Sequence, residues 1–204
     1  ELVSRFFPAW CVGRNPRTKF IHASYNADLS ASFGRVIRDR IREPRFQNVF
    51  PGVSLAPEAM ARDEWATTAG GTYKAEGVGG GLIGFHAHIA IVDDPTKDWE
   101  QASSATHREM LWNWYTSVLL NRLRPYKNGP GAVILIMQRW YDDDLGGRVK
   151  RQGEWDVLEV PSIATANDPL GRPEGEALLP EWRSLKELHA IRDENPIQFL
   201  ALHQ

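Results

Sequence analysis

The chain has 204 residues, of which 42% are hydrophobic and 25% charged, so it is long enough for one globular domain with a sizeable core. The formal net charge of −2 argues against a strong overall electrostatic attraction to nucleic acid, and the single Cys11 excludes an internal disulfide. No apolar run approaches the roughly 18 residues that span a bilayer, and the amino terminus has no signal-peptide pattern, so we expect a cytosolic protein.

Positive charge is concentrated near the amino terminus. Residues 1–50 hold nine Lys or Arg against four acids, a local balance of 9 − 4 = +5. This basic lobe suits transient contacts with phosphate groups. The alternative is an ordinary solvated helix face, which we favour for the run from Arg35 to Arg45 taken alone.

The first elements predict an alternating α/β order. Residues 1–12 have the pattern of a helix that begins without a capping residue, which suggests that the start of the chain is cut. We expect the other end of the chain to be cut as well. Residues 19–24 form a predicted strand, and residues 24–42 a helix that Pro44 terminates. This order is typical of a doubly wound sheet.

The glycine-rich middle of the chain contains a misleading motif. Residues 65–68 and 72–75 predict a hairpin around Gly70-Gly71. Residues 79–84 then satisfy G-x-G-x-x-G, but they lead into a strand rather than opening a helix, so we interpret them as a turn. His86 and His88 lack further ligands at zinc spacing and are expected to be structural.

Residues 89–95, Ile-Ala-Ile-Val-Asp-Asp-Pro, form the most informative motif. The unbroken apolar run predicts a strand buried on both faces, and Asp93 and Asp94 follow where open α/β sheets bind ligands. In P-loop NTPases this is the Walker B position, where the first acid holds Mg²⁺ and its neighbour positions the attacking water. The alternative is a solvated Asp-Asp-Pro turn.

A helix and a second apolar strand follow. Ser103 or Ser104 is expected to cap a helix that runs to about Leu123. Residues 132–137 predict another buried strand, which delivers Gln138 and Arg139 to the same sheet edge as the acids. The triplet at residues 142–144 is expected to start a short helix ending at Gly146-Gly147, with metal binding as the less favoured alternative.

Taken in order, these stretches resemble the ATPase half of the large terminase subunit, the genome-packaging motor of tailed double-stranded DNA phages. The resemblance is carried by residues 24–29, 80–84 with 89–95, 112–125, 134–145 and 199–204, and so covers nearly the whole chain.

The resemblance implies a three-layer α/β/α P-loop fold of the RecA-like, additional-strand catalytic-glutamate type, with residues 1–204 as a single ATPase domain fragment. It implies Mg²⁺ and ATP as cofactors, with Asp93 as the metal ligand and Asp94 as the residue that orients or deprotonates water. Gln138 and Arg139 would sense the γ-phosphate, and Arg122 or Arg124 is a candidate arginine finger acting on a neighbouring subunit.

It also implies a homo-oligomeric ring that works in the host cytoplasm at the procapsid portal vertex. Its partners would be double-stranded DNA, the portal protein and the small terminase subunit, with no membrane.

The chain departs from the family pattern in several places. Asp94 stands where many P-loop motors carry Glu, Tyr141 where His is expected and Gln138 where Thr is common. No G-x-x-x-x-G-K-[ST] phosphate loop occurs in the 204 residues. We expect that loop just upstream of Glu1 and the nuclease domain beyond the other end, so this fragment should be inactive alone.

Three functions therefore remain open: a packaging ATPase, a non-catalytic DNA-binding or assembly module that uses the basic lobe, and a metal-dependent nuclease. The nuclease would use Asp93, Asp94 and the triplet at residues 142–144, but two adjacent acids on one strand should diverge rather than converge on paired metal ions.

Overall fold

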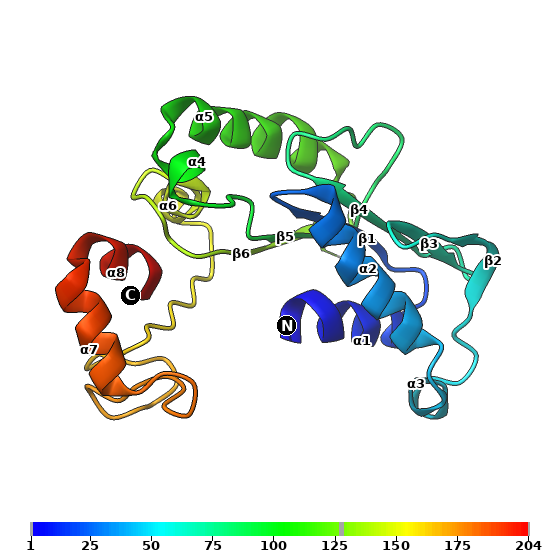
Figure 1. The fold of residues 1–204 in the computed structure, drawn as a ribbon. Helices are drawn as coiled ribbons and strands as arrows, with labels where there is room; N and C mark the ends of the chain where they lie inside the picture. The colour runs from blue at the N-terminus through cyan, green and yellow to red at the C-terminus, as the bar shows by residue number, and fades with distance from the viewer. Residues whose placement is uncertain (1, 127–128, 204) are drawn as a thin grey trace. The chain divides into compact units, whose positions relative to one another are not determined.

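The computed structural model describes residues 2–126 and 129–203, and within them the chain forms two compact units (Figure 1). The first unit consists of residues 1–97 and 105–137, and the second of residues 98–104 and 138–204. Each unit is described by itself. Among the described residues, no helix combines the length and apolar character needed to cross a membrane.

The first unit is built on a six-stranded mixed sheet of order β2-β3-β4-β1-β5-β6. β1 pairs in parallel with β4 and β5, and β5 in parallel with β6, whereas the β2-β3 and β3-β4 pairs are antiparallel. The strand bounds are β1 Lys19–Ser24, β2 Leu55–Met60, β3 Glu64–Thr67, β4 Thr72–Gly77, β5 Ile89–Asp93 and β6 Ala132–Ile136. The predicted strands at residues 19–24 and 89–93 and the β3-β4 hairpin are confirmed, whereas β2 was not predicted.

Helices pack on this sheet as an α/β protein requires. α1 (Phe7–Arg14) and α2 (Ala27–Ile41) lie along one side of the sheet and α5 (Ala105–Trp114) lies on the other, consistent with three layers (Figure 1). A short π-helical turn, η1 (Leu2–Phe6), precedes α1, and α3 (Pro44–Val49) follows α2. The main core gathers Phe20, Ile37, Trp65, Tyr73 and Ile91 with their neighbours.

One predicted helix start differs from the structure, and another agrees with it. α2 begins at Ala27 rather than Ser24, because Ser24 completes β1 and the Asn26 side chain accepts a hydrogen bond from the Leu29 N–H at 2.8 Å. The helix expected from Ser103 or Ser104 begins at Ala105 and continues as η2 (Tyr115–Leu119) and η3 (Leu120–Arg122).

The prediction that β6 is buried was wrong. β6 is the last strand of the sheet, and its residues are exposed at Ala132 and only partly buried from Val133 to Ile136. An apolar run shows that a segment is a strand, but it does not show how many partners the strand has.

The second unit contains α4 (Trp99–Ser103), α6 (Leu145–Gln152), α7 (Leu185–Glu194) and α8 (Pro196–His203). Asp144 caps α6, which includes Gly146 and Gly147 and ends at the left-handed Gly153, so the predicted end at Gly146-Gly147 was wrong. α7 starts with a capping box between Ser184 and Glu187. A small core of Ala177, Leu188 and Phe199 holds α7 and α8 together.

Candidate functional site

The carboxyl end of β5 places Asp93 in the interior of the first unit. Its carboxylate is buried and accepts a hydrogen bond from the hydroxyl of Ser4, which is also buried and lies in η1. A buried carboxylate is costly unless it has a hydrogen-bond donor, and Ser4 provides one. This hydrogen bond therefore holds η1 against the carboxyl end of β5.

Asp94 holds an unusual backbone conformation next to this pair. Its φ is +45°, and it is the one non-glycine residue with positive φ in the described part of the chain. The Asp94 N–H donates to the Ile136 carbonyl at 2.9 Å, while its own carbonyl accepts from the Tyr25 N–H at 3.0 Å. The ends of β1, β5 and β6 thus clamp Asp94 in a left-handed conformation that costs an L-residue about 1–2 kcal/mol.

A second buried polar pair, which sequence reasoning missed, lies on the neighbouring strands. The Tyr73 hydroxyl is 2.8 Å from Nδ1 of His22, and both side chains are fully buried. Burial lowers the pKa of His22 to about 3, so its ring is neutral, and it stacks on Phe33 with centroids 4.9 Å apart. Burial and the negative charge of Asp93 raise the pKa of Tyr73, which places this pair within electrostatic range of the site.

The side chains at the carboxyl end of β5 supply oxygen atoms of the kind that bind a hard cation. The carboxylates of Asp93 and Asp94 and the hydroxyl of Ser4 are hard oxygen ligands of the kind that Mg²⁺ takes. Over the described residues, no three His, Cys, Asp or Glu side chains gather around a common point. Mg²⁺ commonly uses one or two carboxylates and completes its shell with waters and phosphate oxygens.

Gln138 and Arg139 belong to the second unit and follow β6 directly in the chain. Gln138 lines a pocket of about 500 Å³ within that unit, together with Ser162, Trp182, Arg183 and His203. Arg139 Nε donates to both carboxylate oxygens of Asp144, at 2.9 and 3.1 Å. Arg139 is therefore held by an ion pair and does not project freely into solvent.

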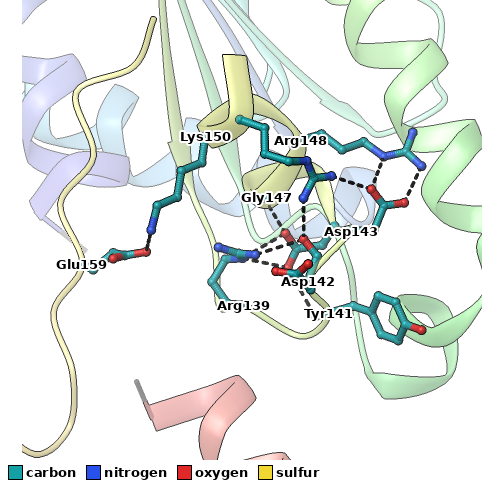
Figure 2. Close-up of polar contacts among 10 residues, drawn as sticks. Arg139, Tyr141, Asp142, Asp143, Gly147, Arg148, Lys150 and Glu159 are labelled. Carbon is teal, nitrogen blue, oxygen red and sulfur yellow. Dashed lines mark hydrogen bonds and ion pairs between the residues drawn. The ribbon is translucent and has the colours of Figure 1, made fainter. Parts of the chain in front are cut away.

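Nearby arginine side chains and backbone N–H groups form hydrogen bonds and ion pairs with the acidic triplet at residues 142–144 (Figure 2). Asp144 also accepts the Gly147 N–H at 2.8 Å and so caps α6, while the Asp142 carbonyl accepts from Arg139 Nη2 at 3.3 Å. Asp143 pairs with Arg148 at 2.8 Å and with Arg151 at 2.6 Å. Hydrogen bonds from Arg148, together with the charges of both arginines, lower the pKa of Asp143. These contacts favour the capping interpretation of the triplet over metal binding.

Arg122 and Arg124 lie near the amino-terminal end of β5, whereas Asp93 lies at its carboxyl end. Their backbones pair with Ala87, through Ala87 N–H to Arg122 O at 2.9 Å and Arg124 N–H to Ala87 O at 2.8 Å. Ala87 lies just before β5, six residues before Asp93. Six residues of extended chain span about 20 Å. Neither arginine therefore reaches the Asp93 carboxylate of its own chain.

The glycine motif lies in a turn, as predicted, and His88 makes a structural hydrogen bond. Residues 78–84 form turns between β4 and β5 with no helix after them, so the G-x-G-x-x-G pattern has no dinucleotide-binding context. Nδ1 of His88 accepts a hydrogen bond from the Lys19 N–H at 3.1 Å.

The fold and the site together define an α/β protein whose mostly parallel sheet presents paired acids at the end of a central strand. A model of the family described as terminase large subunit, T4likevirus-type, N-terminal matches residues 1–199. The chain belongs to this family, which supports a role in phage DNA packaging. A comparison with curated proteins gave no match.

Proposed function

We propose that this chain is the ATPase motor domain of a phage terminase large subunit, which powers translocation of double-stranded DNA into the procapsid. The observation that carries the proposal is the Ser4–Asp93–Asp94 arrangement at the carboxyl end of β5. The arrangement combines a hydroxyl in a helical segment, the buried carboxylate of Asp93 and the second acid Asp94. P-loop NTPases bind Mg²⁺ and nucleotide phosphates with a hydroxyl and a carboxylate at the carboxyl end of a strand.

In this proposal the two acids have different tasks. Asp93, buried and hydrogen-bonded, holds the metal, and Mg²⁺ bound there would neutralise charge on the phosphate oxygens. Asp94, fixed by its two backbone hydrogen bonds, orients or deprotonates the attacking water. Its carboxylate is about one methylene shorter than the Glu of many P-loop motors, so the clamped backbone has to bring it closer to the water.

Gln138 and Arg139 are proposed to sense the γ-phosphate and to relay its loss to elements that grip DNA. The chain itself connects them to the site, because the Ile136 carbonyl accepts the Asp94 N–H and Arg139 follows three residues later. Any contribution to hydrolysis by Arg122 or Arg124, about 20 Å away along the strand direction, is restricted to the site of a neighbouring subunit.

The proposed partners are ATP, double-stranded DNA, the portal protein and the small terminase subunit, with the protein working as a ring at the portal vertex in the host cytoplasm. The 204 residues contain no G-x-x-x-x-G-K-[ST] sequence. Since phosphoryl transfer depends on such a loop, we propose that hydrolysis requires the full-length large subunit.

The test is DNA-stimulated ATP hydrolysis by the full-length subunit carrying Asp93→Ala. We expect loss of at least a hundredfold in kcat, because the carboxylate that holds the metal is removed. Asp28→Ala is the matched control, since Asp28 is an exposed acid in the first turn of α2 that pairs only with Arg62. Wild-type hydrolysis by Asp93→Ala would contradict the site assignment and favour the non-catalytic DNA-binding module.

A further inference from the structure

Three cationic side chains and one histidine gather near the amino-terminal ends of β1 and β5, at the opposite end of these strands from Asp93. We call Lys19, His86, Arg122 and Arg124 the amino-edge cluster. Backbone hydrogen bonds hold their three segments side by side: His88 N–H donates to Lys19 O at 2.8 Å, and Ala87 exchanges hydrogen bonds with Arg122 and Arg124. The cluster is therefore fixed by the sheet and does not depend on a flexible loop.

Lys19, Arg122 and Arg124 give the cluster its positive charge. Among the described residues, no carboxylate forms an ion pair with Lys19, Arg122 or Arg124. Arg38 and Arg62, two other cations of the first unit, do pair with carboxylates, those of Asp39 and Asp28. This edge thus keeps several uncompensated charges although the whole chain has a net charge of −2.

Hydrogen-bonding capacity is also left over at this edge. Nδ1 of His86 and Nε of Arg122 are buried atoms that lack a hydrogen-bond partner within the described residues. Arg124 Nη1 donates to the carbonyls of Asn121 and Leu123, at 3.2 and 2.9 Å, which holds its guanidinium in place while its other N–H groups stay available. Partial burial and the charges of Arg124, Arg122 and Lys19 lower the pKa of His86, so all three cations act on this one ring.

We propose that the amino-edge cluster is a binding surface for the phosphate backbone of double-stranded DNA. Three cations drawn from two segments, with His86 on the segment between them, form a surface wider than one phosphate group, whereas duplex DNA presents a charge about every 1.7 Å along its axis. The contacts are to phosphates and carry no base specificity, as a motor that moves along any sequence requires. The biological meaning of this surface rests on the proposed packaging function, but the binding itself needs no ATP.

The experiment measures the affinity of the 204-residue chain for a fluorescent 30-base-pair duplex of mixed sequence, by anisotropy without nucleotide, between 50 and 200 mM salt. For Arg122→Gln/Arg124→Gln we expect the slope of log affinity against log salt to fall in magnitude by about 2, because about two phosphate contacts are lost. Affinity at about 100 mM salt should drop at least tenfold.

Arg183→Gln/Lys186→Gln is the matched control, because it removes the same charge from two exposed cations of the second unit, outside the basic lobe of residues 1–50. It should keep the wild-type slope. Equal losses in the two double variants, or an unchanged slope in the Arg122→Gln/Arg124→Gln variant, would overturn the proposal. So would competition by ATP as strong as competition by unlabelled duplex, which would instead indicate a site for nucleotide phosphates.

If Arg122→Gln prevents folding, the same measurement on the single variants Lys19→Gln and Arg124→Gln tests whether the cluster binds DNA. Each should lower the slope by about 1. Failure of ATP hydrolysis in the full-length subunit would not affect these results, so the two proposals are tested separately.

Discussion

The hydroxyl of Ser4 donates a hydrogen bond to the buried carboxylate of Asp93, across 89 residues of sequence. This contact ties the opening helix to the strand that carries the candidate site. Removing the donor would leave a buried charged oxygen without this partner, and such a loss costs about 1–3 kcal/mol.

Ser4→Ala should therefore lower the free energy of unfolding by about 1–3 kcal/mol. Urea denaturation at neutral pH measures this change. Ser32→Ala is the control, because the Ser32 hydroxyl donates only to the Leu29 carbonyl within its own helix. If both variants unfold at the same urea concentration, the Ser4–Asp93 contact contributes nothing to stability.

Replacing Asp94 by glycine should affect protein stability and ATP hydrolysis differently. Asp94→Gly relieves the cost of the left-handed backbone at φ +45° but also removes the carboxylate. We expect unchanged or slightly raised stability, within about 1 kcal/mol, together with loss of ATP hydrolysis in the full-length subunit. Asp94→Val should destabilise by about 1–2 kcal/mol or more, because a β-branched residue tolerates positive φ poorly. Equal thermal stability of the two variants would argue against a strained backbone at this position.

His22 should make the protein sensitive to mild acid. Its folded pKa of about 3 lies far below the ordinary value of about 6.5, so between these values the unfolded chain takes up a proton that the folded protein does not. Stability contributed by neutral His22 is thus complete above about pH 6.5 and is lost as the pH falls, by at most about 1.4 kcal/mol per pH unit.

The comparison is urea unfolding of wild type and His22→Gln at pH values from 7 to 4.5. The difference in stability between the two proteins should shift in favour of the variant as the pH falls. A difference that stays constant with pH would mean that His22 is protonated equally in both states.

The pairing of Arg139 with Asp144 predicts a role for Asp144 in coupling. Asp144→Asn keeps a good cap on α6 but removes the negative charge that holds Arg139. In the full-length subunit we expect it to act like Arg139→Ala: ATP hydrolysis continues, while the DNA packaged per ATP falls several-fold. Asp143→Asn is the control, since it loses the pairs with Arg148 and Arg151 and leaves Arg139 held. Equal coupling defects in the two Asn variants would show that α6 as a whole, and not Arg139, is what matters.

The pKa of His86 reports on the amino-edge cluster. In Arg122→Gln/Arg124→Gln the repulsion from two cations disappears, so the pKa of His86 should rise toward 6.5. NMR titration of the ring protons measures it, and His203 in the second unit serves as an internal control because its lowered pKa has other causes, burial and Arg183. An unmoved His86 pKa would mean that the arginine charges do not face its ring.

Local patterns in the sequence determined much of the first unit. The apolar runs at residues 19–24 and 89–93 predicted β1 and β5, and the Asp-Asp-Pro that follows predicted acids at a strand end. Such features depend on neighbours in the chain, namely side-chain alternation, turn residues and helix breakers, and are therefore visible without the fold.

Other features were decided only by the tertiary structure. The Ser4–Asp93 bond, the His22–Tyr73 pair and the edge position of β6 join or separate segments that lie far apart in sequence. A periodicity shows which face of an element is apolar, but it carries no record of which strand lies beside which. Strand pairing depends on the packing of the whole sheet, and the parallel pairing of β1 with β5 places Lys19 at the amino-terminal ends of these strands and Asp93 at their carboxyl ends.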